Sequence, residues 1–219
     1  MPSKNPRPVA EHEFGTVSSE TVYVGKILAL RLDEVAMPGG GTARREVVEH
    51  FGAVAVVALD DDDTVTLVYQ YRHPIGRRLW ELPAGLIDIA GENIQLAAAR
   101  ELEEETGLVA ADWSVLVDVI SAAGFCDESV RVYLATGLTE VDRPGAHDEE
   151  ADLQVHRFPL SEAVQMVYRG EVVNALAIAG ILAAHGVREG VARPRPADAP
   201  WPDRPTRLAA RHHGVTAHT

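Results

Sequence analysis

Cysteine is almost absent from this chain of 219 residues. Its single cysteine, Cys126, has no partner for a disulfide within the chain, and a zinc site built from several cysteines is excluded. The chain also lacks any run of about 18 apolar residues, the length that a membrane-spanning helix needs. Residues 1–14 lack the apolar centre of a signal peptide. We therefore expect a cytoplasmic protein with no membrane partner.

Positively charged residues are scarce as well. Lys and Arg number 20 against 33 Asp and Glu, so the formal net charge is −13. A general nucleic-acid-binding protein carries a basic face, and we therefore expect no nucleic-acid partner. A small phosphorylated substrate stays compatible with this charge, because a bound metal ion inverts the charge of its site.

The strongest pattern in the chain is an acidic helix predicted within residues 85–108. Good helix formers fill its middle, and Gly107 is a typical C-terminal stop. Glu101, Glu104 and Glu105 follow the spacing i, i+3, i+4 and therefore share one face. Their mutual repulsion, at the negative end of the helix dipole, is costly without a cation. Carboxylate oxygens suit Mg²⁺, although a solvated acidic face is the alternative interpretation of this pattern alone.

The same region resembles the Nudix box. The box consists of Gly, five residues, Glu, seven residues, and then Arg-Glu-apolar-X-Glu-Glu-X-Gly-apolar. Glu92, seven further residues and the segment 100–108 (RELEEETGL) match every position from the first glutamate onward. Six residues, rather than five, separate Gly85 from Glu92, and a loop can absorb such an insertion. The resemblance implies the Nudix α/β/α sandwich with a mixed central sheet.

Predicted strands lie on both sides of this helix, which indicates an α+β layered domain. Strands are expected at 21–36, 45–50, 52–59, 64–71, 113–120, 129–135 and 153–158, and helices at 161–169 and 172–185. The first strands, joined by a glycine-rich turn at 37–41, form either a small N-terminal antiparallel sheet or extra strands of the main sheet; we expect the former. We divide the chain into an N-terminal arm and β-meander (1–50), a catalytic domain (51–188) and an extended C-terminal tail (189–219). This tail would be partly disordered or pinned by Trp201.

Segments outside the box are similar to the ADP-ribose pyrophosphatase branch of Nudix hydrolases, especially that of high-GC Gram-positive bacteria. They are residues 45–52, 69–72, 80–85 and 129–135, together with the pair Glu149-Glu150. Ala123 departs from the branch, which usually has proline before the glycine at 124. The resemblance implies Mg²⁺-dependent hydrolysis of the pyrophosphate bond of ADP-ribose to AMP and ribose 5-phosphate, with Mn²⁺ as a possible substitute. It also implies a homodimer whose N-terminal sheet is exchanged between subunits.

The resemblance further assigns a metal site to the acidic helix. Its ligands would be Glu101, Glu104, Glu105 and the carbonyl oxygen of Ala84. The metal would neutralise the phosphates and lower the pKa of the attacking water. Arg100 and Glu92 would be structural, because an arginine beside such ligands orients carboxylates through paired hydrogen bonds.

The general base would come from a loop after the last core strands. Glu150 matches that position, and Glu149 is the near alternative. The residues alone favour a solvent-exposed loop glutamate, and the resemblance favours the catalytic role.

Six residues would bind the substrate: Arg45, Glu46, Arg72, Glu81, Phe125 and Glu128. Arg72 suits a phosphate, because a guanidinium group matches phosphate oxygens. Arg45 and Glu46, both from the partner subunit, would contact adenosine with Glu81. The last two residues would line the ribose end. Surface ion pairs, cross-strand charge pairs and loop packing are the respective alternatives.

Two other functions fit the same fold. One is a Nudix hydrolase of other nucleoside diphosphate sugars. The other is a non-catalytic Nudix module that senses ADP-ribose, which the full set of helix carboxylates disfavours.

Overall fold

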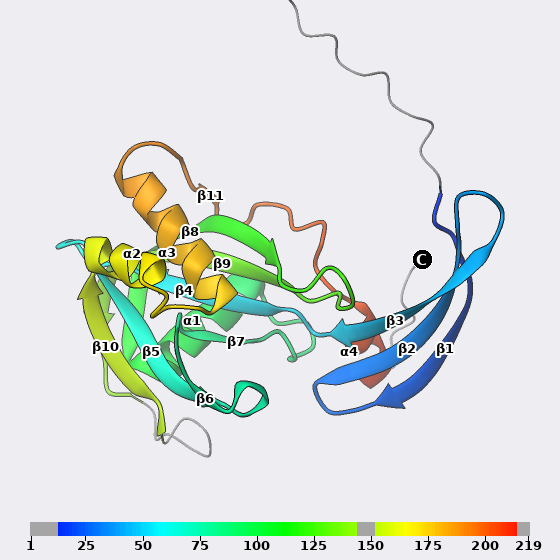
Figure 1. Cartoon of the computed structure of the whole chain (residues 1–219). Coiled ribbons are helices and arrows are strands. Elements are labelled where there is room, and N and C mark those ends of the chain that lie inside the picture. Colours follow the sequence, from blue (N-terminus) through cyan, green and yellow to red (C-terminus); the bar gives the residue numbers. More distant parts are fainter. Residues whose placement is uncertain (1–12, 144–151, 214–219) are drawn as a thin grey trace, which may run out of the picture.

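The computed structural model describes residues 13–143 and 152–213. Its strands form three sheets, and one of them projects from the body of the molecule (Figure 1). The projecting sheet consists of β1 (Thr16–Val24), β2 (Leu28–Ala36) and β3 (Thr42–His50). These strands are antiparallel in the order β1-β2-β3. The expected small N-terminal antiparallel sheet is therefore confirmed.

The single β-like segment predicted at 21–36 is wrong in one respect, because it spans parts of two strands. The Gly25 N–H donates to the carbonyl oxygen of Leu28 at 2.8 Å and closes the turn between β1 and β2. On β2 the buried side chains are Ala29, Arg31 and Asp33, whereas the leucines on the other face are only half-buried in the single chain. Apolar periodicity thus located a strand but not its buried face.

The central sheet is mixed and has the order β11-β8-β9-β4-β7. Its strands are β4 (Ala53–Ala58), β7 (Ala84–Leu86), β8 (Leu108–Ile120), β9 (Ser129–Glu140) and β11 (Arg195–Pro196). Strand β4 is parallel to β9, and the other neighbours are antiparallel. Every residue of β4 is buried, as its continuous apolar run predicts.

A second antiparallel sheet has the order β10-β5-β6. Its strands are β10 (Gln154–Pro159), β5 (Thr64–Arg72) and β6 (Arg77–Glu81). A short 3-10 helix, η1 (His73–Ile75), joins β5 to β6. This hairpin brings Arg72 and Glu81 to neighbouring strands, which matters for the site described below.

Helices cover both faces of the central sheet (Figure 1). Helix α1 (Ile94–Thr106) packs on one face through Ala97, Ala98 and Leu102. Helices α2 (Leu160–Tyr168) and α3 (Ala175–Arg188) contribute to the core of the other face. The expected α/β/α sandwich is confirmed. Among the described residues, no helix is both long and apolar enough to cross a membrane.

The segment after α3 is not simply extended. Its described part contributes β11 to the central sheet and contains helix α4 (Arg207–His213), which lies beside β3 (Figure 1). The indole N–H of Trp201 donates to Ser129 Oγ at 3.0 Å, and the Arg131 guanidinium lies 4.9 Å from the Trp201 ring centroid. The segment is thus anchored by Trp201 within its described part, while the helix was not expected. The division at residues 50 and 188 stays a prediction.

Candidate active site

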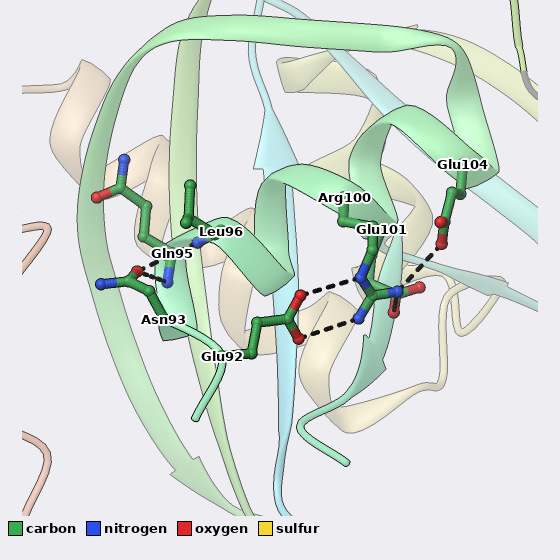
Figure 2. Close-up of polar contacts among 7 residues, drawn as sticks. All are labelled: Glu92, Asn93, Gln95, Leu96, Arg100, Glu101 and Glu104. Carbon is green, nitrogen blue, oxygen red and sulfur yellow. Dashed lines mark hydrogen bonds and ion pairs between the residues drawn. The ribbon is translucent and has the colours of Figure 1, made fainter. Parts of the chain in front are cut away.

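Helix α1 ends where its sequence predicts, and Asn93 marks its beginning. The Asn93 side chain accepts hydrogen bonds from the backbone N–H groups of Gln95 and Leu96 at 2.9 and 3.2 Å (Figure 2). These contacts cap the N-terminus. At the other end Gly107 takes the left-handed conformation, with φ 70°, and its N–H donates to the Glu103 carbonyl oxygen at 2.8 Å. The acidic residues therefore occupy the last two turns.

Two of these carboxylates lie against the start of β7. The Glu105 side chain is only 7% exposed, and one of its oxygens accepts a hydrogen bond from the Ala84 backbone N–H at 3.0 Å. The Glu101 carboxylate lies directly against Gly85, since a Cβ atom built there would be 2.0 Å from Glu101 Cδ. Gly85 thus forms a cradle, by which we mean a position on β7 where the absence of a side chain leaves room for the Glu101 carboxylate. The fold brings three predicted metal ligands, Ala84, Glu101 and Glu105, to one place.

Arg100 links the other acidic residues of the site (Figure 2). Its guanidinium donates to both oxygens of Glu92, at 3.2 and 3.3 Å. It also donates to Glu101 Oε1 at 2.6 Å and to Glu104 Oε2 at 3.1 Å. The hydrogen bonds to Glu92 are the largest cause of the raised pKa of Arg100, and the charge of Glu101 adds to it. This is the arrangement expected of residues that orient carboxylates, and that role stays a prediction.

The donor set at the end of α1 fits a hard divalent cation. Carboxylate oxygens and backbone carbonyl oxygens are the ligands that such ions prefer. The absence of a side chain at Gly85 leaves room for the Glu101 carboxylate, and the Glu105 carboxylate is buried. Within residues 13–143 and 152–213, no three His, Cys, Asp or Glu side chains already form a metal cage. Arg100 instead holds one oxygen each of Glu101 and Glu104.

Arg72 and Glu81 form a preorganised pair on the β5–β6 hairpin. Arg72 Nη2 donates to Glu81 Oε2 at 2.6 Å, and Nε lies 3.1 Å from both oxygens. Gln70 Nε2 donates to the same carboxylate at 3.1 Å. Glu81 is 3% exposed, whereas 41% of the Arg72 side chain is exposed. The contacts of Glu81 indicate that it orients the partly exposed Arg72 guanidinium.

The loop at 121–128 carries Phe125 and Glu128. Phe125 is 59% exposed, which leaves its ring available to a ligand. The Glu128 carboxylate accepts a hydrogen bond from Ser121 Oγ, and its Oε1 lies 3.3 Å from His50 Nδ1. Glu128 therefore has internal partners that a substrate hydroxyl group would have to share.

Arg45 and Glu46 lie on β3, both exposed, in the projecting sheet. The Arg45 guanidinium donates to the Arg44 carbonyl oxygen at 2.8 Å. Neither residue forms a hydrogen bond or ion pair with α1 in the described part of this chain. Glu149 and Glu150, the two candidate bases, lie outside the described residues.

Two contacts of this site were not predicted from the sequence. Gln70, on β5, supports Glu81, and alternation in that strand gives no sign of it. The backbone N–H of Ala84 binds Glu105, whereas the prediction concerned the Ala84 carbonyl oxygen. The signal for Gly85 was present, because glycine opens the Nudix box.

The carboxylates of α1, set against β7 in an α/β/α sandwich, define a Nudix protein. The model of the NUDIX domain matches residues 49–176, more than half of the chain, so the chain belongs to the Nudix family. The model of the nucleoside diphosphate sugar hydrolase N-terminal domain matches residues 15–48, which include most of the projecting sheet. Nudix ADP-ribose pyrophosphatases generally depend on a divalent metal.

Within the family, the chain is similar to named hydrolases. It is 64% identical over 203 residues to an ADP-ribose pyrophosphatase of Mycobacterium tuberculosis, covering 93% of this chain and 98% of that protein. It is 36% identical over 163 residues to an ADP-ribose pyrophosphatase of Bacillus subtilis, covering 74% and 88%. The crystal structure of an ADP compounds hydrolase matches with a TM-score of 0.72 at 21% identity, covering 84% of this chain and 98% of that one. At that identity the structural match shows the fold. The predicted family and fold are confirmed.

Proposed function

We propose that this chain hydrolyses the pyrophosphate bond of ADP-ribose to give AMP and ribose 5-phosphate, with Mg²⁺ bound at the end of α1. The identity of 64% to an ADP-ribose pyrophosphatase, over 93% of the chain, carries the choice of substrate. The reaction class is supported by the carboxylates set against the cradle at Gly85.

Glu101, Glu104, Glu105 and the Ala84 carbonyl oxygen would hold the metal. Once bound, the metal would neutralise negative charge on the phosphates and lower the pKa of the attacking water. Arg100, anchored by Glu92, bridges Glu101 and Glu104 and would orient these carboxylates. Mn²⁺ has the same preference for oxygen ligands and would substitute for Mg²⁺.

Substrate contacts come from several elements. Arg72, oriented by Glu81, would bind a phosphate oxygen, since guanidinium groups match that geometry. Phe125 and Glu128 would line the ribose end. Glu150 would take the proton from the attacking water, with Glu149 as the alternative base.

We propose a homodimer in which Arg45 and Glu46 of one subunit reach the adenosine bound by the other. Exposed apolar side chains on β1 support this assembly, because an apolar patch of this kind marks an interaction surface: Val17, Val22, Tyr23 and Val24. A cytoplasmic location is proposed from the single free thiol, Cys126.

The test is hydrolysis of ADP-ribose, other nucleoside diphosphate sugars, NADH and diadenosine polyphosphates with Mg²⁺. Wild type is compared with Glu105→Gln and Glu150→Gln, and Arg188→Gln, which breaks a remote exposed pair with Asp63, serves as the control. We expect preferential cleavage of ADP-ribose, loss with chelation, recovery with Mg²⁺, and losses of about 10²-fold or more in both glutamine variants. Binding without cleavage would favour a sensor, and preference for another sugar would favour the broader hydrolase.

A further inference from the structure

Helix α4 is fastened to the junction between the projecting sheet and the sandwich. Its Leu208 side chain is fully buried and packs against Ala29 and Phe51. His212 Nε2 lies 3.1 Å from the Gly25 carbonyl oxygen. The helix thus contacts both the first turn of the sheet and the segment after β3. It lies beyond residue 176, where the match to the NUDIX domain ends.

A fully buried carboxylate lies at the centre of this junction. Glu49, on β3, is 0% exposed. It accepts hydrogen bonds from Arg211 Nε and Nη2, the latter at 3.0 Å, and its Oε1 lies 2.9 Å from Arg31 Nε. Burying a carboxylate costs free energy unless it is paired, so the buried Glu49 depends on Arg211 for its counter-charge. Arg31 cannot neutralise Glu49 alone, because it is also paired with Asp33.

The same stretch of β3 holds the loop at 121–128. The Val48 N–H donates to the Phe125 carbonyl oxygen at 2.7 Å, and the Asp127 N–H donates to the Val48 carbonyl oxygen at 3.0 Å. The His50 N–H donates to Asp127 Oδ1 at 2.8 Å. Residues 48–50 therefore connect α4 to the loop that carries Phe125. The same strand carries Arg45 and Glu46.

We propose that Arg211 is a positioning residue for the substrate: through Glu49 it sets where β3 and the 121–128 loop lie relative to the sandwich. This inference rests on the proposed function. Helix α1 packs on β4, β7 and β8, whereas α4 packs on β3. Loss of Arg211 therefore disturbs residues proposed to hold the substrate and leaves the metal-binding carboxylates in place.

The experiment compares steady-state kinetics of Arg211→Gln, Arg211→Lys and the double variant Glu49→Gln/Arg211→Gln with wild type on ADP-ribose. We expect Arg211→Gln to raise KM about tenfold or more, with kcat changed less than about twofold, because it removes ground-state and transition-state binding equally. Arg211→Lys would recover part of the affinity by restoring the charge. The double variant would do better than Arg211→Gln, since it buries no unpaired carboxylate.

Two controls separate positioning from general destabilisation. Arg188→Gln removes an exposed arginine–carboxylate pair elsewhere. Met166→Ala destabilises α2, because it removes a buried side chain from the core. We expect KM to stay near wild type in both. A folded Arg211→Gln protein with the KM of these controls would overturn the inference.

A second readout distinguishes this failure from failure of the proposed function. Amide hydrogen exchange of Val48 and Asp127, measured on the full chain without substrate, should speed up in Arg211→Gln and stay unchanged in Arg188→Gln. If wild type does not cleave ADP-ribose, the proposed function fails while exchange still tests the contact network. Unchanged exchange in Arg211→Gln would overturn the inference whatever the substrate.

Discussion

At the scale of single residues, the closest fit in the site is between Gly85 and Glu101. A Cβ at residue 85 would lie 2.0 Å from Glu101 Cδ and 2.2 Å from Oε1, well inside van der Waals contact. The carboxylate position therefore depends on the absence of a side chain on the neighbouring strand. One methyl group there moves a proposed metal ligand.

Gly85→Ala is expected to lower kcat/KM for ADP-ribose by about 10²-fold, because displacing a reacting group by about 1 Å can cost that much. The measurement is steady-state hydrolysis with saturating Mg²⁺, with folding checked by circular dichroism. Gly186→Ala is the matched control, since a Cβ at that helical glycine meets nothing within 4 Å. Equal activity of the two variants would contradict the cradle.

Asp118 provides a prediction about pH. Burial alone would raise the pKa of this carboxyl, but hydrogen bonds from Arg131 and Arg195 outweigh burial and lower it. The Arg131 Nε donates to Asp118 Oδ1 at 2.8 Å, and Arg195 Nη2 donates to Oδ2 at 2.9 Å. A carboxyl with a lowered folded pKa contributes stability above its unfolded pKa of roughly 3.9, and loses it as the pH falls through the folded pKa.

Asp118→Asn is expected to lower the free energy of unfolding by about 2–3 kcal/mol at pH 7, because it leaves Arg131 buried without a full counter-charge. The difference from wild type should shrink as the pH falls below about 4. Urea unfolding at a series of pH values measures this difference in the free energy of unfolding. A difference that is the same at pH 7 and at low pH would show that the charge is unimportant.

Residue spacing explains how much of the site could be predicted. Glu101, Glu104 and Glu105 were identifiable because helical periodicity places them on one face and Gly107 ends the helix. The contact between the Ala84 N–H and Glu105 could not be predicted, because Ala84 lies 21 residues earlier on a strand. No local pattern specifies how a strand is placed beside a helix. The internal partners of Glu128 were hidden for the same reason.

At the scale of elements, the packing of α3 depends on a glycine. A Cβ at Gly180 would lie 2.6 Å from Leu82 Cδ1 and 3.0 Å from Val57 Cγ2, both in the buried core. The helix can approach the sheet closely because this position has no side chain.

Gly180→Ala should therefore reduce stability by roughly 1–2 kcal/mol, because the cost of overpacking exceeds the gain in helix propensity. Gly186→Ala, on the same helix but open to space, should gain about 0.5–1 kcal/mol. Chemical denaturation of both variants gives the comparison. Stabilisation by both would mean that α3 tolerates a larger separation from the sheet.

Elements were predictable where their periodicity was long. Helix α1 and the buried strand β4 have unambiguous patterns. The turn between β1 and β2 was not predictable, because Gly25 is the only glycine or proline in a long run of β-forming residues. Helix α4 has only seven residues, too few to show a helical period, and it contains two Arg and two His. Contacts with β3, rather than helix propensity, stabilise it.

At the scale of the whole molecule, the proposed dimer makes each site a joint product of two chains. Strand β1 exposes its apolar side chains, and the leucines of β2 are only half-buried. A second subunit would cover this surface. Arg45 and Glu46 would then act on the neighbouring site.

Mixing two inactive subunits tests this arrangement. Glu46→Ala and Glu105→Gln, each inactive as a homodimer, should recover about a quarter of wild-type activity when coexpressed, because half of randomly formed dimers contain one intact site. Activity of the affinity-purified mixture is the measurement. If Glu46 serves its own chain, the mixture stays inactive.

The contacts of α4 also set an order of events during synthesis. Arg211 pairs with Glu49 across 162 residues of sequence, and His212 contacts Gly25 across 187. At roughly 5–20 residues per second, the ribosome needs about 10–30 s to make the chain between Glu49 and its partner. During that interval the Glu49 carboxylate of the nascent sheet lacks its partner Arg211. The projecting sheet can therefore reach its final stability only after α4 has left the ribosome.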